Sequence, residues 1–390
     1  MHMASGRRLS VTPRLTAALL ATVALAAGLV ALSTDPPQAV VACAKVAAPG
    51  GADSAAGSAE APYRSAQTLV DSLAPGETGC LRGGSYDDGG DTYVLDPAKG
   101  GSDGAPITVR SYPGERAKLV GIVKIDSDDV TLSTLDLEGT GEQNTIKVYA
   151  EDTVIEDSDI TNASRGRSCL ILGSIDEPGR TVRTIVRRNT FHECGDAGNR
   201  EARDHAIYTA SMADGKIVDN VIYNPAAYAI TLNPDAQGNL IAHNVIDGAS
   251  ALDRGGVVLG SDENYASNEN VIERNVIAHA ETYSITTAWS GETGSRNLAR
   301  ANCVWDARIE NIAPEEGFTA KDNTVADPGF VDRSARDYRL GAGSPCLAVV
   351  GYDTAARLSG RSPDTPLRKW IRWLVTAPRP SGAVAGPTGR

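Results

Sequence analysis

The segment Asn239-Leu240-Ile241-Ala242-His243-Asn244-Val245-Ile246 returns 31 residues later as Asn270-Val271-Ile272-Glu273-Arg274-Asn275-Val276-Ile277. Related units begin at Thr184 and Lys216, and weaker copies begin at Thr153, Arg300 and Lys321. The asparagine that these units share lies at Asn189, Asn220, Asn244, Asn275, Asn302 and Asn323. The steps between these asparagines are 31, 24, 31, 27 and 21 residues, a period typical of stacked structural repeats.

A second short run of apolar and β-branched residues lies between successive units. These runs cover residues 145–148, 169–172, 206–209, 229–232, 256–259 and 284–287. Two or three short strands in each repeat predict a parallel β-solenoid, whose coils hydrogen-bond to the coils above and below. Helical patterns do not alternate with these strands, which excludes Rossmann and TIM-barrel folds. We expect the repeated asparagines in the bends, because asparagine tolerates left-handed φ and its amide can pair with the asparagine one coil away.

The composition fits one long repetitive domain. Glycine supplies 40 of the 390 residues, aromatic residues supply 5% and hydrophobic residues 41%. Such a chain has a core of small aliphatic side chains and turns at short intervals. This excludes a helical bundle, and it excludes a disordered chain, which could not bury so much apolar surface.

The charge is distributed unevenly along the chain. The formal net charge is −12, but residues 1–33 carry +3 and residues 361–390 carry +5, so residues 34–360 carry −20. An acidic body repels polyanions unless a basic groove or a bound cation intervenes. We therefore expect no nucleic-acid partner.

The N-terminus predicts export. Arg7, Arg8 and Arg14 precede a nearly uncharged apolar run over residues 15–32. Residues 1–33 read as a secretory signal peptide, with a retained membrane anchor as the alternative, since about 18 apolar residues also suffice to span a bilayer. The body is then secreted, or anchored and facing outside.

The six cysteines agree with export because their number is even and none lies in a Cys-x-x-Cys spacing. Sequential pairing, one of fifteen connectivities, would join Cys43 with Cys80, Cys169 with Cys194, and Cys303 with Cys346. A catalytic thiol is the alternative to disulfides.

Four segments follow from these patterns. Residues 1–33 are the signal or anchor, 34–61 a small-residue linker, 62–355 the solenoid, and 356–390 a basic amphipathic tail. A helix is expected over residues 62–73, where positions 66, 69, 70 and 73 are apolar. The tail either covers the C-terminal end of the solenoid or contacts an anionic surface. We expect a monomer.

The chain resembles the right-handed parallel β-helix proteins of the pectate-lyase-like superfamily over about residues 43–352. Three features carry this resemblance. They are the repeated asparagine units, the segment 79–86 with Gly79-Cys80-Leu81-Arg82-Gly83-Gly84, and the closing segments 326–332 and 337–345. The resemblance implies an all-β, single-stranded right-handed parallel β-helix. In it the N-terminal helix caps the open end of the solenoid, where strand edges need cover. It also implies a secreted protein that acts on polysaccharides.

Outward-facing side chains of stacked strands in this fold form a groove for a linear polymer. Aligning the strands on the inward residues places Ile146, Leu170, Ile207, Ile230, Val257 and Ile285 in one row. The outward row is then Lys147, Ile171, Tyr208, Thr231, Val258 and Thr286. Polar and charged residues gather at the ends of these strands, in segments 203–208, 228–235 and 253–263.

The densest of these segments contains Arg203, Asp204, His205 and Tyr208. His205 is the candidate general base, with Asp204 orienting its imidazole. Tyr208 would donate a proton or stack on a sugar, and Arg203 and Arg254 complete the catalytic candidates. The alternative is that Asp204 and His205 only cap the strand and bind backbone.

Further candidates contact substrate or metal. The expected substrate-binding residues are Lys147, Tyr228, Asp235, Asp253 and Trp289. Carboxylate and amide oxygens suit Ca²⁺, so Asp262, Glu263 and Asn264 are the expected ligands of a calcium ion, the cofactor that superfamily lyases often use.

Two reactions and one binding role fit these residues. In β-elimination, a base such as His205, a lysine or an arginine removes the C5 proton of a uronate, while a cation neutralises its carboxylate. Glycoside hydrolysis instead needs flanking carboxylates, which Asp204, Asp235, Asp253 and Asp262 would supply. The third possibility is a cell-surface or wall protein that binds glycans without chemistry. Elimination is the favoured prediction.

Overall fold

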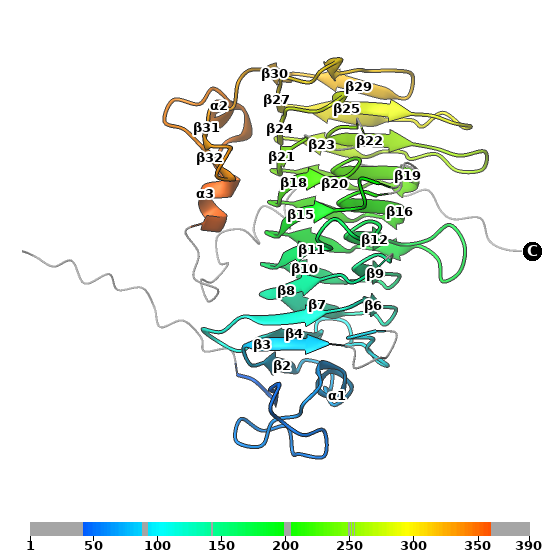
Figure 1. Ribbon diagram of the computed structural model, residues 1–390. Coiled ribbons are helices and arrows are strands. Elements are labelled where there is room, and N and C mark those ends of the chain that lie inside the picture. Colours follow the sequence, from blue (N-terminus) through cyan, green and yellow to red (C-terminus); the bar gives the residue numbers. More distant parts are fainter. Residues whose placement is uncertain are drawn as a thin grey trace, which may run out of the picture. The chain divides into compact units, whose positions relative to one another are not determined.

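The computed structural model describes residues 42–87, 93–141, 143–198, 204–248, 250, 252 and 254–359. Nearly all regular structure in these residues is β-strand, and the strands build three long parallel sheets that run side by side (Figure 1). Between residues 107 and 312, each coil contributes one strand to each sheet in turn, with one additional short strand at Thr181–Val182. The predicted parallel β-solenoid is confirmed.

Sheet A has eleven strands, in the order β1 (Lys45–Ala47), β2 (Thr78–Leu81), β4 (Ile107–Ser111), β7 (Val130–Ser133), β10 (Val154–Glu156), β14 (Ile185–Arg187), β17 (Lys216–Val218), β20 (Leu240–Ala242), β23 (Val271–Glu273), β26 (Asn297–Arg300) and β29 (Phe318–Lys321).

Sheet B has ten strands, in the order β3 (Gly84–Asp87), β5 (Ala117–Val120), β8 (Leu135–Glu138), β11 (Asp159–Thr161), β15 (Thr190–Cys194), β18 (Val221–Pro225), β21 (Val245–Asp247), β24 (Val276–Ala278), β27 (Cys303–Trp305) and β30 (Thr324–Val325).

Sheet C stacks β6 (Val123–Ile125), β9 (Ile146–Val148), β12 (Leu170–Leu172), β16 (Ile207–Ala213), β19 (Ile230–Gln237), β22 (Val257–Gly260), β25 (Tyr283–Ala288) and β28 (Glu310–Ile312). The short strand β13 (Thr181–Val182) pairs with β16 beside this path.

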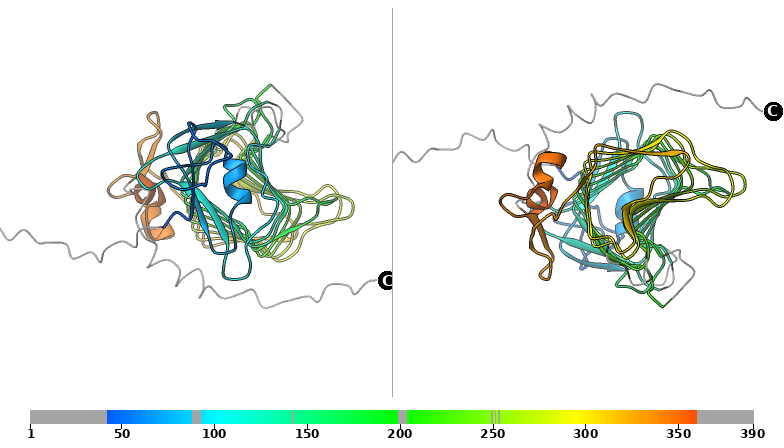
Figure 2. Two further views of the ribbon diagram at one scale, coloured as in Figure 1. Left: turned by 90° about the horizontal axis from the view of Figure 1, so that it is seen from below. Right: turned by 90° about the horizontal axis from the view of Figure 1, so that it is seen from above.

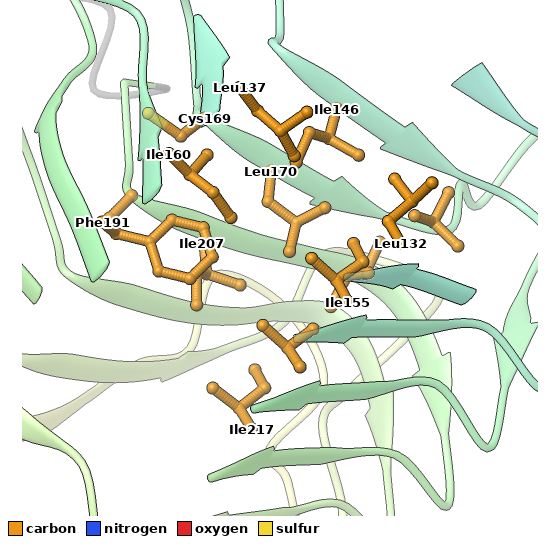
Figure 3. Packing of buried hydrophobic residues seen from close by; sticks show 14 of the residues in the cluster. Leu132, Leu137, Ile146, Ile155, Ile160, Cys169, Leu170, Phe191, Ile207 and Ile217 are labelled. Atoms are coloured by element: carbon orange, nitrogen blue, oxygen red, sulfur yellow. The ribbon is translucent and has the colours of Figure 1, made fainter. Parts of the chain in front are cut away.

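The interior is filled mostly by aliphatic side chains, one or two from a strand. Leu132 and Ile155 of sheet A, Ile160 of sheet B, and Ile146 and Leu170 of sheet C all point into it (Figure 3). All five are fully buried. Because the space between three sheets is narrow, small branched side chains fill it, which accounts for the scarcity of aromatic residues.

The repeated asparagines form a ladder in the bend between sheets A and B. The backbone N–H and the Nδ2 of Asn220 both donate to Oδ1 of Asn244, at 3.0 Å each, and Asn244 donates to Asn275 in the same way. The same bonds continue to Asn302 and Asn323. The pairing predicted between coils is confirmed.

The predicted backbone reason for these asparagines is wrong. The left-handed conformation belongs to the residue before each one, as in Asp219 with φ of 60° and His243 with φ of 55°. The turn bends at that residue, so the asparagine that follows can point its amide along the stack.

Helix α1 (Ala66–Asp71) is shorter than the expected helix over residues 62–73, and its apolar positions are confirmed as buried. Seen from below, it lies across the end of the coil (Figure 2). Its Leu69 packs so closely on Gly79 of β2 that a Cβ there would lie 2.3 Å from the leucine. A larger side chain at residue 79 would therefore displace Leu69.

Both expected solenoid boundaries shift. Strand β1 lies within the segment 34–61 that was expected to be a linker, and it pairs with β2. At the other end the stack stops at β30. Residues 326–359 then form β31 (Phe330–Asp332), the antiparallel β32 (Asp337–Leu340), α2 (Cys346–Val350) and α3 (Thr354–Ser359), which lie beside the strands of sheet B (Figure 1).

The C-terminal segment is fastened to sheet B by polar and aromatic contacts. Tyr338 donates to the buried Asp247 at 3.0 Å, and Arg333 donates to both oxygens of that carboxylate. Tyr352 stacks on His243 with ring centroids 4.3 Å apart. The segment thus covers the outward side of sheet B where a solenoid would otherwise be exposed.

The sequential disulfides are confirmed as Cys43–Cys80, Cys169–Cys194 and Cys303–Cys346. No helix within the described residues is long and apolar enough to cross a bilayer. The expected signal or anchor at 1–33 and the tail from residue 360 onward lie outside those residues.

Candidate functional site

The outward row of sheet C has the register that the sequence predicts. Lys147 pairs with Ile171, Ile171 with Tyr208, Tyr208 with Thr231, Thr231 with Val258, and Val258 with Thr286. The row extends one coil further, because Lys124 of β6 pairs with Lys147 of β9. We call these seven residues the sheet C row.

An aromatic cluster surrounds His205 at the start of β16. The imidazole lies 5.4 Å from the Tyr208 ring and 6.0 Å from the Tyr228 ring, measured between centroids. Its Nδ1 accepts a hydrogen bond from the backbone N–H of Tyr228 at 3.3 Å. The structure therefore brings together His205, Tyr208 and Tyr228, three residues that the sequence singled out.

The environment keeps this imidazole neutral. Burial, and then the positive charge of Arg254, lower the pKa of His205 to about 3. With Nδ1 acting as an acceptor, the neutral ring carries its proton on Nε2. His205 is thus a hydrogen-bond donor at its second nitrogen and a weak base.

Asp204 is fully buried at the bend before β16, where its carbonyl accepts from Ala227 N. Arg203 and Asp253 lie outside the described residues. We keep as predictions the catalytic roles of Asp204, Arg203 and Arg254. The substrate-binding role of Asp253 also stays a prediction.

A second cluster lies two coils away, around Lys147. The ammonium groups of Lys124 and Lys147 lie 5.5 and 6.0 Å from the centroid of the Tyr93 ring. Lys147 also donates to Oε1 of Gln143 at 3.3 Å. Because strands are spaced about 4.8 Å apart, Lys147 lies roughly 10 Å from Tyr208 along the row.

The two lysines have opposite electrostatic environments. Burial lowers the pKa of Lys147, and the charges of Arg167 and Lys124 lower it further. Lys124 instead pairs with Asp126 at 2.5 Å and Asp96 at 3.5 Å, and its pKa is raised, chiefly by the hydrogen bond to Asp126. Pairs whose pKa values are pushed apart are typical of acid–base sites.

Asp235 is held in a saturated network. Arg180 binds both of its oxygens, at 2.7 and 2.6 Å, Ser211 donates at 2.6 Å and Gln237 at 2.9 Å. Asp235 itself is buried. Its acceptor positions are occupied, so any contact with substrate would come from Arg180.

Thr231 lies in the sheet C row on β19, the strand that also carries Asp235. Its side chain is buried, and its hydroxyl has no hydrogen-bond partner among the described residues. Burying a hydroxyl without a hydrogen-bond partner costs free energy of folding. The outward face of sheet C therefore contains a polar group that no described residue uses.

Trp289 follows β25 and packs against its own loop, the core and the next coil. Its indole N–H donates to the carbonyl of Glu316 at 2.9 Å, and its ring closes over Gly294, where a Cβ would lie 2.4 Å away. The contacts are those of a packing residue. The predicted substrate contact stays a prediction.

One of the residues expected to bind Ca²⁺, Asp262, helps to shape its own loop. Oδ1 of Asp262 accepts from the backbone N–H groups of Asn264 and Tyr265, at 2.8 Å each, which uses this oxygen to shape the loop. Across the described residues, no group of three or more His, Cys, Asp or Glu side chains is placed to hold a metal. The calcium requirement stays a prediction.

A cavity of about 280 Å³ lies on sheet B, away from the sheet C row. Its charged residues are paired with one another or with neighbours, as in Lys118 with Glu138 and His192 with Asp159. These pairs neutralise the walls, so the cavity is a weaker candidate than sheet C.

Lys124, Tyr93, Arg167 and Arg180 belong to the site and were missed by the sequence reasoning. One signal was available for Lys124. The triplet Val123-Lys124-Ile125 precedes Ile146-Lys147-Val148 by one repeat, so both lysines occupy the same outward position. No comparable signal marks Tyr93, Arg167 or Arg180, which lie in loops or irregular segments.

Comparisons with known proteins agree with this architecture. Residues 120–325 match the family described as right-handed β-helix region. Over 102 residues the chain is 35% identical to the pectate lyase PEL9 of Emericella nidulans (strain FGSC A4), which is 26% of this chain and 23% of that protein. The chain thus spans less than a quarter of that relative's length.

Two solved structures share the fold. The pectate lyase Pel9A superposes with a TM-score of 0.53 at 15% identity, covering 78% of this chain and 91% of its own. A rhamnogalacturonan lyase superposes with a TM-score of 0.55 at 10% identity, covering 77% and 94%. At such identities the likeness extends to the fold alone.

Proposed function

The chain belongs to the right-handed β-helix family, and from this premise we propose that it is a secreted polysaccharide lyase. It cleaves a uronate-containing polymer by β-elimination on the outward face of sheet C. The relative PEL9 and the neighbour Pel9A are named pectate lyases, and a second neighbour is named a rhamnogalacturonan lyase. Those names support this reaction class.

The observation that carries the proposal is the environment of Lys147. Its side chain projects from the sheet C row, and its pKa is lowered by burial, Arg167 and Lys124. A lysine needs such a shift to act as a general base near neutral pH. The cations that lower its pKa would also neutralise the carboxylate of a uronate bound beside Lys147.

The reaction balances with groups on this face. Lys147 Nζ takes the proton from C5 of the uronate, and the electron pair of that C–H bond forms the C4=C5 double bond. The bond from C4 to the glycosidic oxygen breaks, and that oxygen takes a proton from solvent. Arg167 and Lys124 stabilise the charge that develops on the carboxylate during proton removal.

This assignment places the base at Lys147, whereas the sequence favoured His205. An imidazole whose pKa is about 3 is a poor proton acceptor at neutral pH. We assign His205, Tyr208 and Tyr228 to sugar binding, with the His205 Nε2–H as a donor. Aromatic rings with polar edges suit the faces and hydroxyl groups of sugars.

Hydrolysis is less well supported than elimination. It needs two carboxylates free to act on opposite sides of one bond. Asp235 is bound by Arg180, Ser211 and Gln237, and it therefore lacks the freedom of a catalytic acid or base.

Secretion is part of the proposal. Three disulfides are typical of proteins that fold in an oxidising compartment. We propose that residues 1–33 direct export, as a cleaved signal or as an outward-facing anchor.

The test is a screen of the purified protein on polygalacturonate, rhamnogalacturonan, alginate, chondroitin and neutral glycans. β-Elimination produces an unsaturated uronate that absorbs ultraviolet light, and we expect this product from at least one acidic polymer. New reducing ends without that absorbance would indicate a hydrolase. No product from any polymer would indicate a protein that binds glycans only. A parallel series with EDTA tests the predicted calcium ion.

A further inference from the structure

The geometry points to Arg180 as a specificity-determining residue that binds a substrate carboxylate away from Lys147, with Asp235 as its positioning residue. This inference rests on the proposed function, because it assumes that a polymer lies along sheet C. It narrows the substrate class to polymers with free carboxylates at more than one position.

Arg180 is oriented by contacts on two strands. Its Nε donates to Ser211 Oγ at 3.3 Å and to Asp235 Oδ2 at 3.2 Å, and its Nη2 donates to both Asp235 oxygens. Two parallel bonds between a guanidinium and a carboxylate fix the plane of the arginine. The side chain is thus preorganised before any ligand binds.

This arginine lies on the outward side of sheet C. Met212 and Ala236, a register pair of β16 and β19, are fully buried in the core. Their neighbours Ser211 and Asp235 therefore point the other way. Arg180 arrives from the segment after β12 and covers these two residues.

Part of the guanidinium remains available. The side chain of Arg180 is 42% exposed, and its hydrogen bonds to described residues come from Nε and Nη2. Arg188, which also binds carboxylates, is only 5% exposed and serves the structure alone. Arg180 keeps a donor edge that a second carboxylate can accept from, in a fork geometry suited to that group.

The position implies a distal subsite. Lys147 lies on β9, and Arg180 is bound to β16 and β19, two and three strands further along sheet C. At about 4.8 Å per strand, the separation along the stack is roughly 10–14 Å. A polymer that places one uronate at Lys147 then places a later one at Arg180. Short oligomers bound at Lys147 do not reach it.

The test compares Arg180→Ala with wild type, with Arg180→Lys, and with the control Arg183→Ala. Arg183 is half-exposed and pairs with Glu151 and Asp152, so its loss removes a similar charge elsewhere. Binding is measured by affinity electrophoresis on polygalacturonate and alginate, and on the methyl-esterified or carboxyl-reduced form of each. Steady-state kinetics are measured on long and short oligomers of any polymer that is cleaved.

We expect Arg180→Ala to weaken binding of the carboxylated polymers roughly tenfold, the order of one charge-assisted hydrogen bond. Binding of the esterified or reduced forms should not change. KM should rise for long oligomers only, with kcat retained, and Arg180→Lys should recover part of the loss. Arg183→Ala should behave like wild type.

Three results would overturn the inference. The first is that Arg180→Ala binds the carboxylated polymers as tightly as Arg183→Ala does. The second is that Arg180→Ala loses as much affinity for the reduced polymers as for the carboxylated ones. The third is that the wild-type protein binds no carboxylated polymer. If the polymers bind with this dependence on Arg180 and no unsaturated product forms, the carboxylate site stands and the lyase proposal fails.

Discussion

Lys147 and Lys124 are register partners on neighbouring strands of sheet C, yet their pKa values move in opposite directions. Lys124 is compensated by two aspartates, whereas Lys147 is partly buried and feels the positive charges of Arg167 and Lys124. One position of the repeat therefore holds a lysine whose charge is stabilised, and the next holds a lysine whose charge is destabilised. This difference is the basis of the proposed chemistry.

The pH dependence of the reaction should report Lys147. The lowered pKa means that the deprotonated lysine appears at a lower pH than in an ordinary lysine, so kcat/KM should rise with pH through that point. Replacing Arg167 by Gln, or Lys124 by Met, removes a charge that lowers this pKa. Each substitution should move the rising limb to higher pH. A limb that stays in place in both variants would contradict the assignment.

His205 should affect binding rather than proton transfer. We expect His205→Asn to raise KM about tenfold, through the loss of a sugar contact, while asparagine still offers an acceptor to Tyr228 N. The pH profile should keep its shape, because the wild-type ring is already neutral above pH of about 3. A fall in kcat of a hundredfold or more at unchanged KM would instead support His205 as the base.

The asparagine ladder should contribute strongly to stability. Asn244→Ala removes the acceptor of Asn220 N and the donor to the Ile217 carbonyl, all buried. Leaving such groups unpaired costs about 1–3 kcal/mol each. Asn323→Ala at the last coil is the control, since Asn323 is only half-buried. Denaturant unfolding should show a clearly larger loss for Asn244→Ala, and equal losses would contradict the ladder's energetic role.

His243 should make the protein less stable in acid. Burial, followed by the charges of Arg274 and Arg357, lowers its pKa to about 3. The unfolded chain, with a pKa near 6.5, then binds a proton that the folded protein does not, so stability falls as pH drops from about 6.5 toward 3. His243→Phe keeps a ring against Tyr352.

The measurement is the urea midpoint of wild type and His243→Phe at pH 7 and at pH 4.5. The drop in midpoint should be smaller in the variant, because one of the groups that titrate on unfolding is gone. An identical drop in both proteins would show that His243 does not contribute.

Local periodicity was enough to predict the fold. In Ile146-Lys147-Val148, the alternation of apolar residues identifies the two outer side chains as inward and Lys147 as outward. The spacing of the asparagines gives the coil length. The residue that takes the left-handed conformation was not predicted, because Asp219, His243 and Ala301 share no side-chain chemistry. Their position before the asparagine is all they have in common.

The candidate site was predicted only in part. His205, Tyr208 and Lys147 follow from strand register, since register fixes which residues share a face. Arg180 binds Asp235 across 55 residues of sequence. That contact depends on the path of the chain after β12, which no periodic pattern encodes. The environment that lowers the pKa of Lys147 likewise comes from Arg167 in an irregular segment.

The central claim is that Lys147 is the general base of the elimination. Its most direct test is the rate at which Lys147→Met forms unsaturated product from the acidic polymer that the wild-type protein cleaves fastest. The control is Lys118→Met, which removes a lysine from the opposite sheet B. Loss of a general base costs about 10²- to 10⁴-fold, so Lys147→Met should lose at least a hundredfold in kcat while it still binds the polymer, and Lys118→Met should retain wild-type activity. Wild-type product formation by Lys147→Met would contradict the account.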